Sequence, residues 1–186
     1  MTSTPRPHVC PWWMGYVIDH PLRRLLQPPE PLLRSYVQSG QTAADLGCGM
    51  GYYTLALARL VGLAGRVYAV DLQPQMLKAL RRRARRRGLL ERIELVQCRA
   101  DRLGLTAPVD FALAANVIHE TPDPGAFLRQ VREILKPEAR FLALEPRGHV
   151  PQADFAATLQ RAREAGLILQ SQSEFRGGRA ALLTAG

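Results

Sequence analysis

Cysteine, lysine and long apolar runs are all scarce in this sequence. The three cysteines, Cys10, Cys48 and Cys98, form an odd set without paired spacing, which argues against a disulfide framework and suits a reducing compartment. Apolar stretches are broken by Arg, Gly or Pro well before the roughly 18–20 residues that a membrane span needs. The N-terminus offers no charged segment followed by an apolar stretch and a small-residue cleavage site, so no secretory signal is predicted. We therefore expect a cytoplasmic protein with no membrane span.

The length and the charge limit the possible organisation and partners. A chain of 186 residues fits one compact domain. Its net charge of +9 and isoelectric point near 10.3 will attract anions, whether nucleic acid, anionic lipid or acidic substrates. Only Lys78 and Lys136 of the 25 basic residues are lysine, an arginine bias that GC-rich coding can produce without selection for binding. The charge alone therefore does not specify a ligand.

Short apolar runs alternate with helical segments beyond residue 40. The pattern predicts helices over 30–39, 52–61, 74–87, 124–135 and 152–165, and strands over 42–46, 66–70, 93–97, 109–115, 140–145, 167–170 and 180–184. This alternation predicts an α/β fold: a single doubly wound, mostly parallel seven-stranded sheet with helices on both faces. The last two strands lack a helix of convincing length between them, so one C-terminal strand should be antiparallel. Residues 1–40 are expected to form an arm or lid packed on the core domain, which spans 41–186.

A glycine-rich loop follows the first predicted strand. In "ADLGCGMGYYT", Gly47, Gly49 and Gly51 lie at a strand-to-helix turn, where glycine allows close ligand approach. Asp71 follows the second strand about twenty residues on, where a carboxylate can accept both hydroxyls of a ribose. Asp45, immediately before the glycines, disfavours a phosphate-bearing dinucleotide and suits a ligand with an ammonium group. Both carboxylates can also be explained structurally, as caps of a turn or a helix.

Residues 43–54 resemble the first motif of class I S-adenosylmethionine-dependent methyltransferases, whose cofactor has an ammonium group and no phosphate. The resemblance continues through "VYAVDLQPQML", "VQCRADRLGL", "VDFALAANVIHE" and "REILKPEARFLALEP", over roughly 41–146. It is nearest in style to the ubiquinone/menaquinone biosynthesis and arsenite methyltransferase-like families. It implies a Rossmann-like enzyme that converts S-adenosyl-L-methionine to S-adenosyl-L-homocysteine, with the cofactor-binding domain over 41–186.

The same resemblance implies roles for individual residues. Asp45, Gly47 and Gly49 would border the methionine moiety, with Cys48 inside the loop. Asp71 would hold the ribose, and Leu72 would lie on the adenine. Asp101 would bind the adenine amino group, and Asn116 would lie beside the methionine part. Asp101 can equally be an ordinary loop residue.

The residues after the fourth strand bear on the methyl acceptor. Amino methyltransferases of nucleic acids share an Asp/Asn-Pro-Pro-aromatic sequence here, whereas this chain reads "ANVIHE", which disfavours base-amine methylation and leaves other RNA targets open. His119 is the candidate catalytic base, with Glu120 a weaker candidate beside it, because histidine exchanges protons near neutral pH. Either residue can instead be a helix-start or packing residue.

The first forty residues carry further candidates for the substrate side. Cys10, Trp13 and Tyr16 lie in a short stretch that could close over the cofactor, although packing anchors are the favoured interpretation of the tryptophans. Cys10 and His8 are too few for a closed metal site unless His119 or Cys48 joins them, so no metal is predicted. Whether this segment binds substrate is left open by the sequence.

A run of basic residues covers the predicted helix at 74–87. Its seven positive charges have no acid between them: Lys78, Arg81, Arg82, Arg83, Arg85, Arg86 and Arg87. A solvated helix face is the favoured interpretation, and an RNA or membrane docking surface is the alternative. The sequence therefore predicts a methyltransferase acting on a small molecule; the alternatives are an RNA or protein methyltransferase that docks through 78–87, and a cofactor-binding protein without catalysis.

Overall fold

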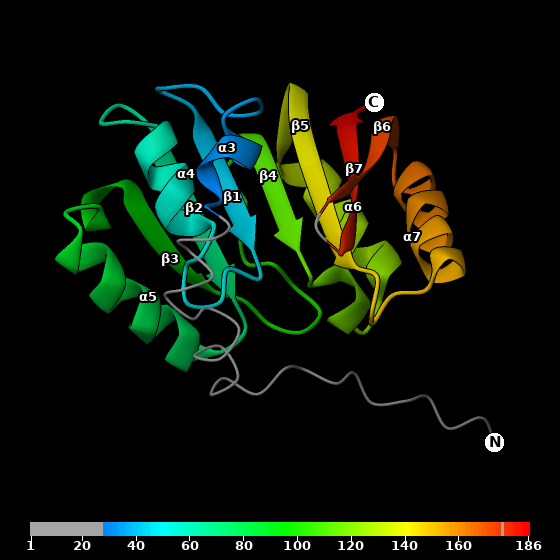
Figure 1. The fold of residues 1–186 in the computed structure, drawn as a ribbon, viewed down its shortest axis with the longest axis horizontal. Coiled ribbons are helices and arrows are strands. Elements are labelled where there is room, and N and C mark those ends of the chain that lie inside the picture. Colours follow the sequence, from blue (N-terminus) through cyan, green and yellow to red (C-terminus); the bar gives the residue numbers. More distant parts are fainter. Residues whose placement is uncertain (1–27, 176) are drawn as a thin grey trace.

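The computed structural model describes residues 28–175 and 177–186 and contains one mixed sheet (Figure 1). Its strands, in chain order, are β1 Thr42–Leu46, β2 Arg66–Asp71, β3 Ile93–Gln97, β4 Val109–Ala115, β5 Leu135–Pro146, β6 Leu167–Phe175 and β7 Gly178–Ala185. In space the order is β3-β2-β1-β4-β5-β7-β6. Strand β7 is antiparallel to β5 and β6, while β3, β2, β1, β4 and β5 pair in parallel. The predicted fold class is confirmed.

Helices cover both faces of this sheet. They are α3 Glu30–Leu33, α4 Thr54–Leu60, α5 Pro74–Arg86, α6 Pro124–Ile134 and α7 Gln152–Glu164. Alternate residues of a strand point to opposite faces, so β4 sends Phe111 to the side of α3, α4 and α5 and sends Ala112 to the side of α6 and α7. Both residues are fully buried. Because both faces of the sheet are buried under helices, its central strands are apolar at nearly every position, which explains the short apolar runs in the sequence.

Several boundaries differ from the predictions made from the sequence. The helix expected over 30–39 ends at Leu33, and the chain continues in turns that bury Val37 and stack Tyr36 on Phe111, with ring centroids 6.2 Å apart. The last strands are longer than expected, because β6 remains paired with β7 through polar residues as far as Phe175. Those residues lie on an edge strand, where backbone pairing needs no apolar side chains.

The strand order reverses between β1 and β4, and this switch point positions the ligand site. In open α/β sheets, ligands bind beyond the carboxyl ends of the strands at such a point. The predicted arm or lid over 1–40 lies largely outside the described residues. In the part that is described, no helix is long and apolar enough to cross a membrane.

Candidate functional site

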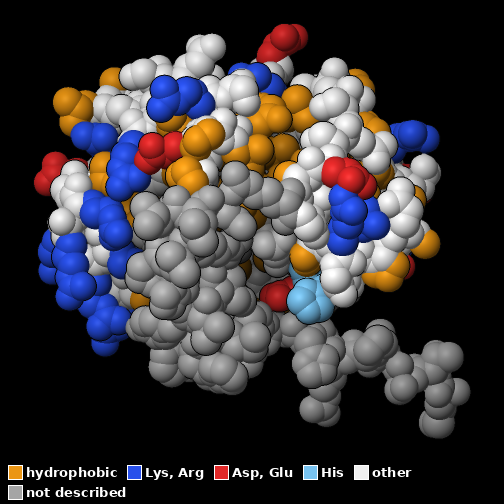
Figure 2. All heavy atoms as spheres, viewed as in Figure 1, with side chains coloured by type: hydrophobic (Ala, Val, Ile, Leu, Met, Phe, Trp, Pro, Cys, Tyr) orange, Lys and Arg blue, Asp and Glu red, His pale blue; other side chains and the backbone are white. Residues whose placement is uncertain are grey.

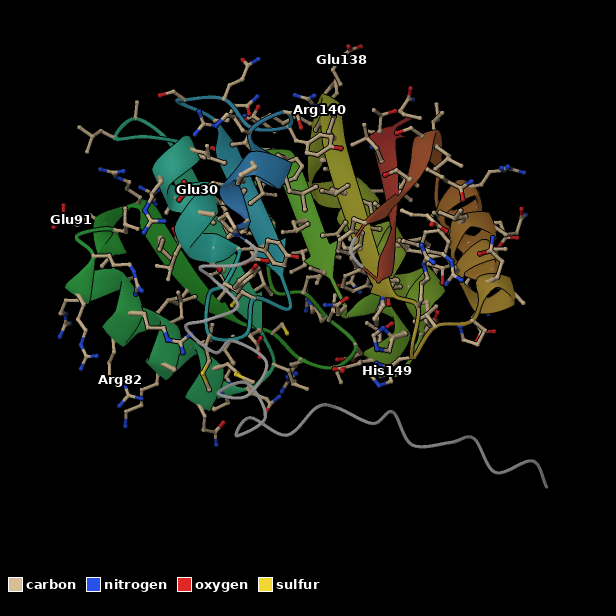
Figure 3. All side chains as sticks on the ribbon, in the orientation of Figure 1. Glu30, Arg82, Glu91, Glu138, Arg140 and His149 are labelled. Atoms are coloured by element: carbon tan, nitrogen blue, oxygen red, sulfur yellow. The ribbon has the colours of Figure 1, made fainter. Side chains whose placement is uncertain are left out.

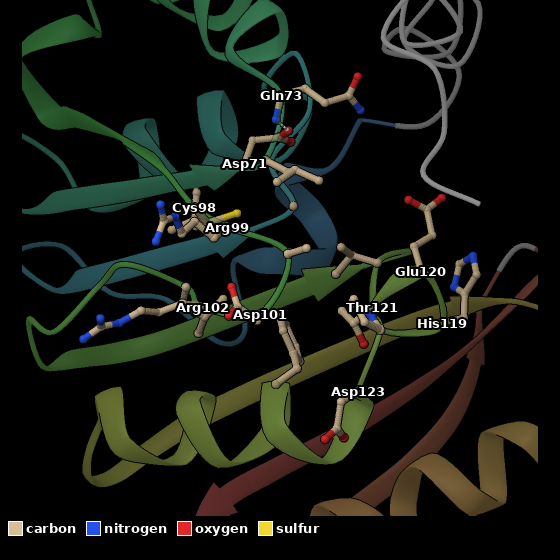
Figure 4. Close-up of a pocket in the computed structure, with 18 of the residues that line it drawn as sticks. Asp71, Gln73, Cys98, Arg99, Asp101, Arg102, His119, Glu120, Thr121 and Asp123 are labelled. Carbon is tan, nitrogen blue, oxygen red and sulfur yellow. Dashed lines mark hydrogen bonds between the residues drawn. The ribbon is translucent and has the colours of Figure 1, made fainter. Parts of the chain in front are cut away.

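A cavity of about 820 Å³ lies at the carboxyl ends of the parallel strands (Figure 4). This volume is in the upper part of the range of roughly 300–1,000 Å³ typical of small-molecule sites. Its walls come from the loops after β1, β2, β3, β4 and β5 and from the N-terminal turns of α5 and α6. Much of the lining is apolar, including Val70, Leu72, Met76, Val117 and Phe127. The cavity thus offers an apolar space with a few polar groups at defined positions.

Eight of the residues predicted from the sequence line this cavity together. They are Gly47, Gly49, Asp71, Leu72, Asp101, Asn116, His119 and Glu120. Two others, Asp45 and Cys48, are buried and are not among the lining residues. The substrate-side candidates Cys10, Trp13 and Tyr16 lie outside the described residues. The fold therefore gathers residues from the loops after β1, β2, β3 and β4 that are far apart in the sequence.

The glycine loop is held against the end of β2. The backbone N–H groups of Gly47 and Cys48 both donate to the carbonyl oxygen of Val70, at 2.8 and 3.0 Å. Gly47 has a φ of +74°, and a Cβ there would lie 2.5 Å from Cγ2 of Val117. By contrast, a Cβ on Gly49 would meet no atom within 4 Å. Both glycines border the cavity, but the loop is closely packed at Gly47 and open at Gly49.

Asp71 connects the glycine loop to the end of β2. Its Oδ2 accepts from the N–H of Gly49 at 2.8 Å, and its Oδ1 accepts from the N–H of Gln73 at 2.9 Å. Burial raises the pKa of this carboxyl, against the opposing effect of backbone donors at Gln73, Gly49 and Leu72. A carboxylate has about four lone-pair positions, so each oxygen can accept a second hydrogen bond. The residues present therefore fit a ligand with two neighbouring hydroxyl groups, such as the ribose of S-adenosylmethionine.

Asp45 lies one layer behind the cavity wall. Only 1% of it is exposed, and its Oδ2 accepts from the hydroxyl of Thr54 at 2.5 Å. Burial raises its pKa to about 7, although the Thr54 hydrogen bond acts in the opposite direction. Its contact with the cofactor's ammonium group stays a prediction, and burial favours the neutral form of this carboxyl.

His119 is hydrogen-bonded to an acid that the sequence analysis did not select. Its Nδ1 contacts Oε2 of Glu145 in β5, while Oε1 of the same carboxyl accepts from the N–H of Ile118 at 3.0 Å. Glu145 is 1% exposed, whereas the His119 side chain is 27% exposed and lines the cavity. The Glu145 hydrogen bond raises the pKa of His119, against the lowering effect of burial, and the charges of Glu145 and Glu120 raise it further.

The sequence analysis missed several polar residues of the site, and Glu145 and His149 are two of them. The others line the cavity: Gln73, Arg99, Arg102, Thr121, Asp123 and Gln130. Glu145 falls in "FLALEP" at the end of a predicted strand, and an acid that interrupts such a run was the available signal. His149 follows in the loop after β5 and also lines the cavity, and Figure 3 labels it at this end of the sheet. Among the described residues, no group of three or more His, Cys, Asp or Glu side chains could hold a metal ion.

Comparison with known proteins identifies the family of the chain. Residues 43–138, just over half of the chain, match the family described as methyltransferase domain. The chain belongs to the methyltransferase domain family. This confirms the predicted class I, Rossmann-like methyltransferase domain, whose relatives include SAM-dependent methyltransferases.

This chain covers a different share of the length of each relative. The ubiquinone/menaquinone biosynthesis C-methyltransferase UbiE of Klebsiella pneumoniae subsp. pneumoniae is 36% identical over 112 residues, which is 60% of this chain and 45% of the relative. The chain thus spans less than half of the curated relatives it matches. A SAM-dependent methyltransferase from Aquifex aeolicus shares its fold, with a TM-score of 0.82, 24% identity, and coverage of 94% of this chain and 98% of that one. TrmN from Thermus thermophilus is 27% identical, with a TM-score of 0.68, over 84% of this chain and 47% of that one.

Proposed function

We propose that this protein transfers a methyl group from S-adenosylmethionine to a small-molecule acceptor bound in the cavity. The observation that carries the proposal is the position of two different chemical groups in one apolar cavity. Asp71, beside the open Gly49, is suited to hold the hydroxyl groups of the donor. His119 lies after β4 in the same cavity and can hold a proton taken from an acceptor. When bound, the donor supplies a methyl group on a positively charged sulfur.

The protein's own residues would do the remaining work. Gly47, Gly49, Asp71, Leu72, Asp101 and Asn116 would bind and orient the donor, and the apolar walls would exclude water from the reacting groups. His119 would accept the proton of the acceptor, with Glu120 next to it. UbiE is named as a C-methyltransferase that acts in quinone biosynthesis. That name favours a small organic acceptor over a macromolecule. A cytoplasmic location fits this function and stays a prediction.

The basic helix gives less support to an RNA acceptor. Lys78, Arg81, Arg82, Arg85 and Arg86 are exposed, and Figure 2 shows blue side chains gathered on the α5 side of the molecule. Among the α5 residues, Met76 lines the cavity, while the labelled Arg82 points away from the sheet in Figure 3. A polyanion on this face would therefore lie on the outside of the helix, away from His119.

Binding of the donor is the first test of the proposal. Isothermal titration of S-adenosylmethionine and S-adenosylhomocysteine should show binding, with NAD giving none. Asp71→Asn removes the negative charge of the carboxylate to which the ligand hydroxyls would donate hydrogen bonds. Because hydrogen bonds to charged groups contribute about 1.5–3 kcal/mol, the affinity for S-adenosylmethionine should fall about tenfold to a hundredfold. Asp154→Asn, at an exposed position in α7, is the matched control and should bind like the wild type. Equal affinity in Asp71→Asn, or preference for NAD, would contradict the assigned cofactor site.

Turnover needs a separate measurement. Methyl-labelled S-adenosylmethionine, incubated with pools of small acceptors and with RNA, should transfer label to a small molecule. Binding without transfer to any pool would instead support a cofactor-binding protein without catalysis. Transfer to RNA that is lost in Arg82→Gln/Arg85→Gln/Arg86→Gln would support docking through the basic helix.

A further inference from the structure

Glu145 connects the end of β5 to the residues after β4. One oxygen of its carboxyl accepts from the backbone N–H of Ile118, and the other contacts Nδ1 of His119. Both bonds are made by a side chain that is 1% exposed, so water does not compete for them. The backbone bond fixes the carboxyl in place, and the carboxyl in turn fixes the plane of the imidazole.

The tautomer of His119 follows from this contact. A carboxylate has only acceptor positions, so the proton between the two groups belongs to Nδ1 of the ring. In the neutral imidazole the lone pair is then on Nε2. Among the described residues, Glu145 is the hydrogen-bond partner of the ring, and the side chain lines the cavity. Nε2 is therefore the nitrogen that remains for a bound molecule.

We propose that Glu145 is a positioning residue that holds His119 as the Nδ1–H tautomer, so that Nε2 takes the proton of an acceptor that enters neutral, such as a phenolic or enolic hydroxyl. This inference rests on the proposed function. The O–H bond of the acceptor breaks and the proton forms a bond to Nε2. The electron pair of the broken bond stays on the acceptor, which can then bond to the methyl carbon that the donor would supply. The proton later leaves the ring to solvent. An acceptor already ionised in solution, such as a thiolate, would need neither residue.

The charges around the ring set the pH at which this base works. Glu145 faces it from β5 and Glu120 from its own turn, while His149 and Asp123 line the same cavity. The pKa of His119 is raised mainly by the Glu145 hydrogen bond. Its basic form is present above that raised pKa and is lost as the pH falls through it. Removing the Glu145 charge should therefore move the titration of His119 to lower pH.

The test uses nitrogen NMR of imidazole-labelled full-length protein, which needs neither acceptor nor cofactor. The wild-type spectrum should show His119 with a proton on Nδ1 in its neutral form; signals absent from His119→Gln identify the residue. In Glu145→Gln, an amide N–H can face Nδ1, so the neutral ring should shift to the Nε2–H form and its pKa should fall by about one unit or more. A wild-type Nε2–H tautomer, or an unchanged pKa in Glu145→Gln, would overturn the proposal.

Glu138→Gln supplies the matched control. It makes the same substitution in the same strand, and Figure 3 labels Glu138 at the opposite end of the sheet from His149. This variant should leave the His119 titration unchanged. If Glu145→Gln does not fold, Glu145→Asp keeps the charge but shortens its reach, and a smaller fall in the pKa is expected. Titration with S-adenosylmethionine separates the two proposals, because failure of the donor to bind would reject the proposed function and leave the tautomer result standing.

Discussion

Gly47 lies where the loops after β1 and β4 meet. Its φ of +74° is in the left-handed region, and Val117 occupies the space that a side chain would need. Gly47→Ala should therefore lower the free energy of unfolding by about 2–4 kcal/mol, from backbone strain and overpacking together. Urea denaturation, followed by circular dichroism, measures the change.

Two further variants separate the causes of that loss. Gly40 has a similar φ of +87°, and no atom lies within 4 Å of where its Cβ would be. Gly40→Ala should therefore lower the free energy of unfolding by only about 1–2 kcal/mol, from backbone strain alone. Val117→Ala in the Gly47→Ala background should restore part of the lost stability, as a positive coupling in a double-mutant cycle. If Gly47→Ala costs no more than Gly40→Ala, the close contact with Val117 does not contribute.

Residues whose role depends on chain position were predictable, and residues whose role depends on a distant partner were not. Gly49 follows β1 and Asp71 ends β2, and the parallel pairing of these consecutive strands brings the two residues together. Glu145 gains its role from His119, 26 positions away, through strand pairing that no local pattern specifies. Asp45 was predicted as a site residue from its place before the glycines. Its burial behind the cavity wall was not predictable in the same way, because it depends on Thr54 and on the packing of α4.

At the scale of elements, apolar periodicity predicted the parts of the fold that are buried on both sides. The first four strands agree with their predicted spans to within one residue. The least accurate spans are β5, β6 and the segment after Leu33: β5 begins five residues earlier than predicted, and both strands extend through backbone pairing, whereas the segment after Leu33 is held by turns. Neither feature needs a repeating apolar pattern, so periodicity could not locate their ends.

Helix α5 concentrates like charges on its exposed side. Arg82 is exposed and lies four residues from both Lys78 and Arg86, the spacing at which helical side chains are neighbours. Arg82→Glu replaces these two repulsive pairs, and a third with Arg85 three residues away, with attractive ones and should raise the free energy of unfolding by about 0.5–1 kcal/mol at low salt. Thermal unfolding at low ionic strength and in about 1 M salt checks this, since screening should remove most of the gain.

Arg82→Gln is the control for the basic helix. It removes the repulsion without creating an attraction, so about half of the stabilisation is expected. A gain that persists in high salt would mean that helix propensity or packing is responsible. No gain at all would mean that solvent already screens the charges of this helix.

At the scale of the whole molecule, the crossover of the chain at the switch point brings six carboxylates near one apolar cavity. Asp71 and Glu145 are buried at strand ends and Asp45 is buried behind them, while Asp101, Glu120 and Asp123 line the cavity. Burying a charge without a full set of partners costs stability, and binding sites commonly retain that cost. A cationic donor would offset part of it, so the protein should be more stable with S-adenosylmethionine than without it.

Asp45→Asn measures that cost directly. The pKa of Asp45 is about 7 in the folded protein, against an ordinary value of 3.8, because the carboxyl is buried. Between pH 3.8 and about 7 the carboxyl of Asp45 is protonated in the folded state and ionised in the unfolded state. The free energy of unfolding therefore falls as the pH rises through this range, and it stays at the lower value above it. Asparagine does not titrate and still offers an oxygen to the hydroxyl of Thr54.

The variant and the wild type should therefore have similar stability near pH 4 and diverge as the pH rises. At about pH 8, Asp45→Asn should be more stable by up to about 4 kcal/mol in the absence of cofactor, as measured by urea denaturation across the pH range. The same variant should bind S-adenosylmethionine more weakly if Asp45 faces the ammonium group, because the neutral amide offers no charge to it. A constant difference between the two proteins at every pH would show that Asp45 keeps its ordinary pKa in the folded state.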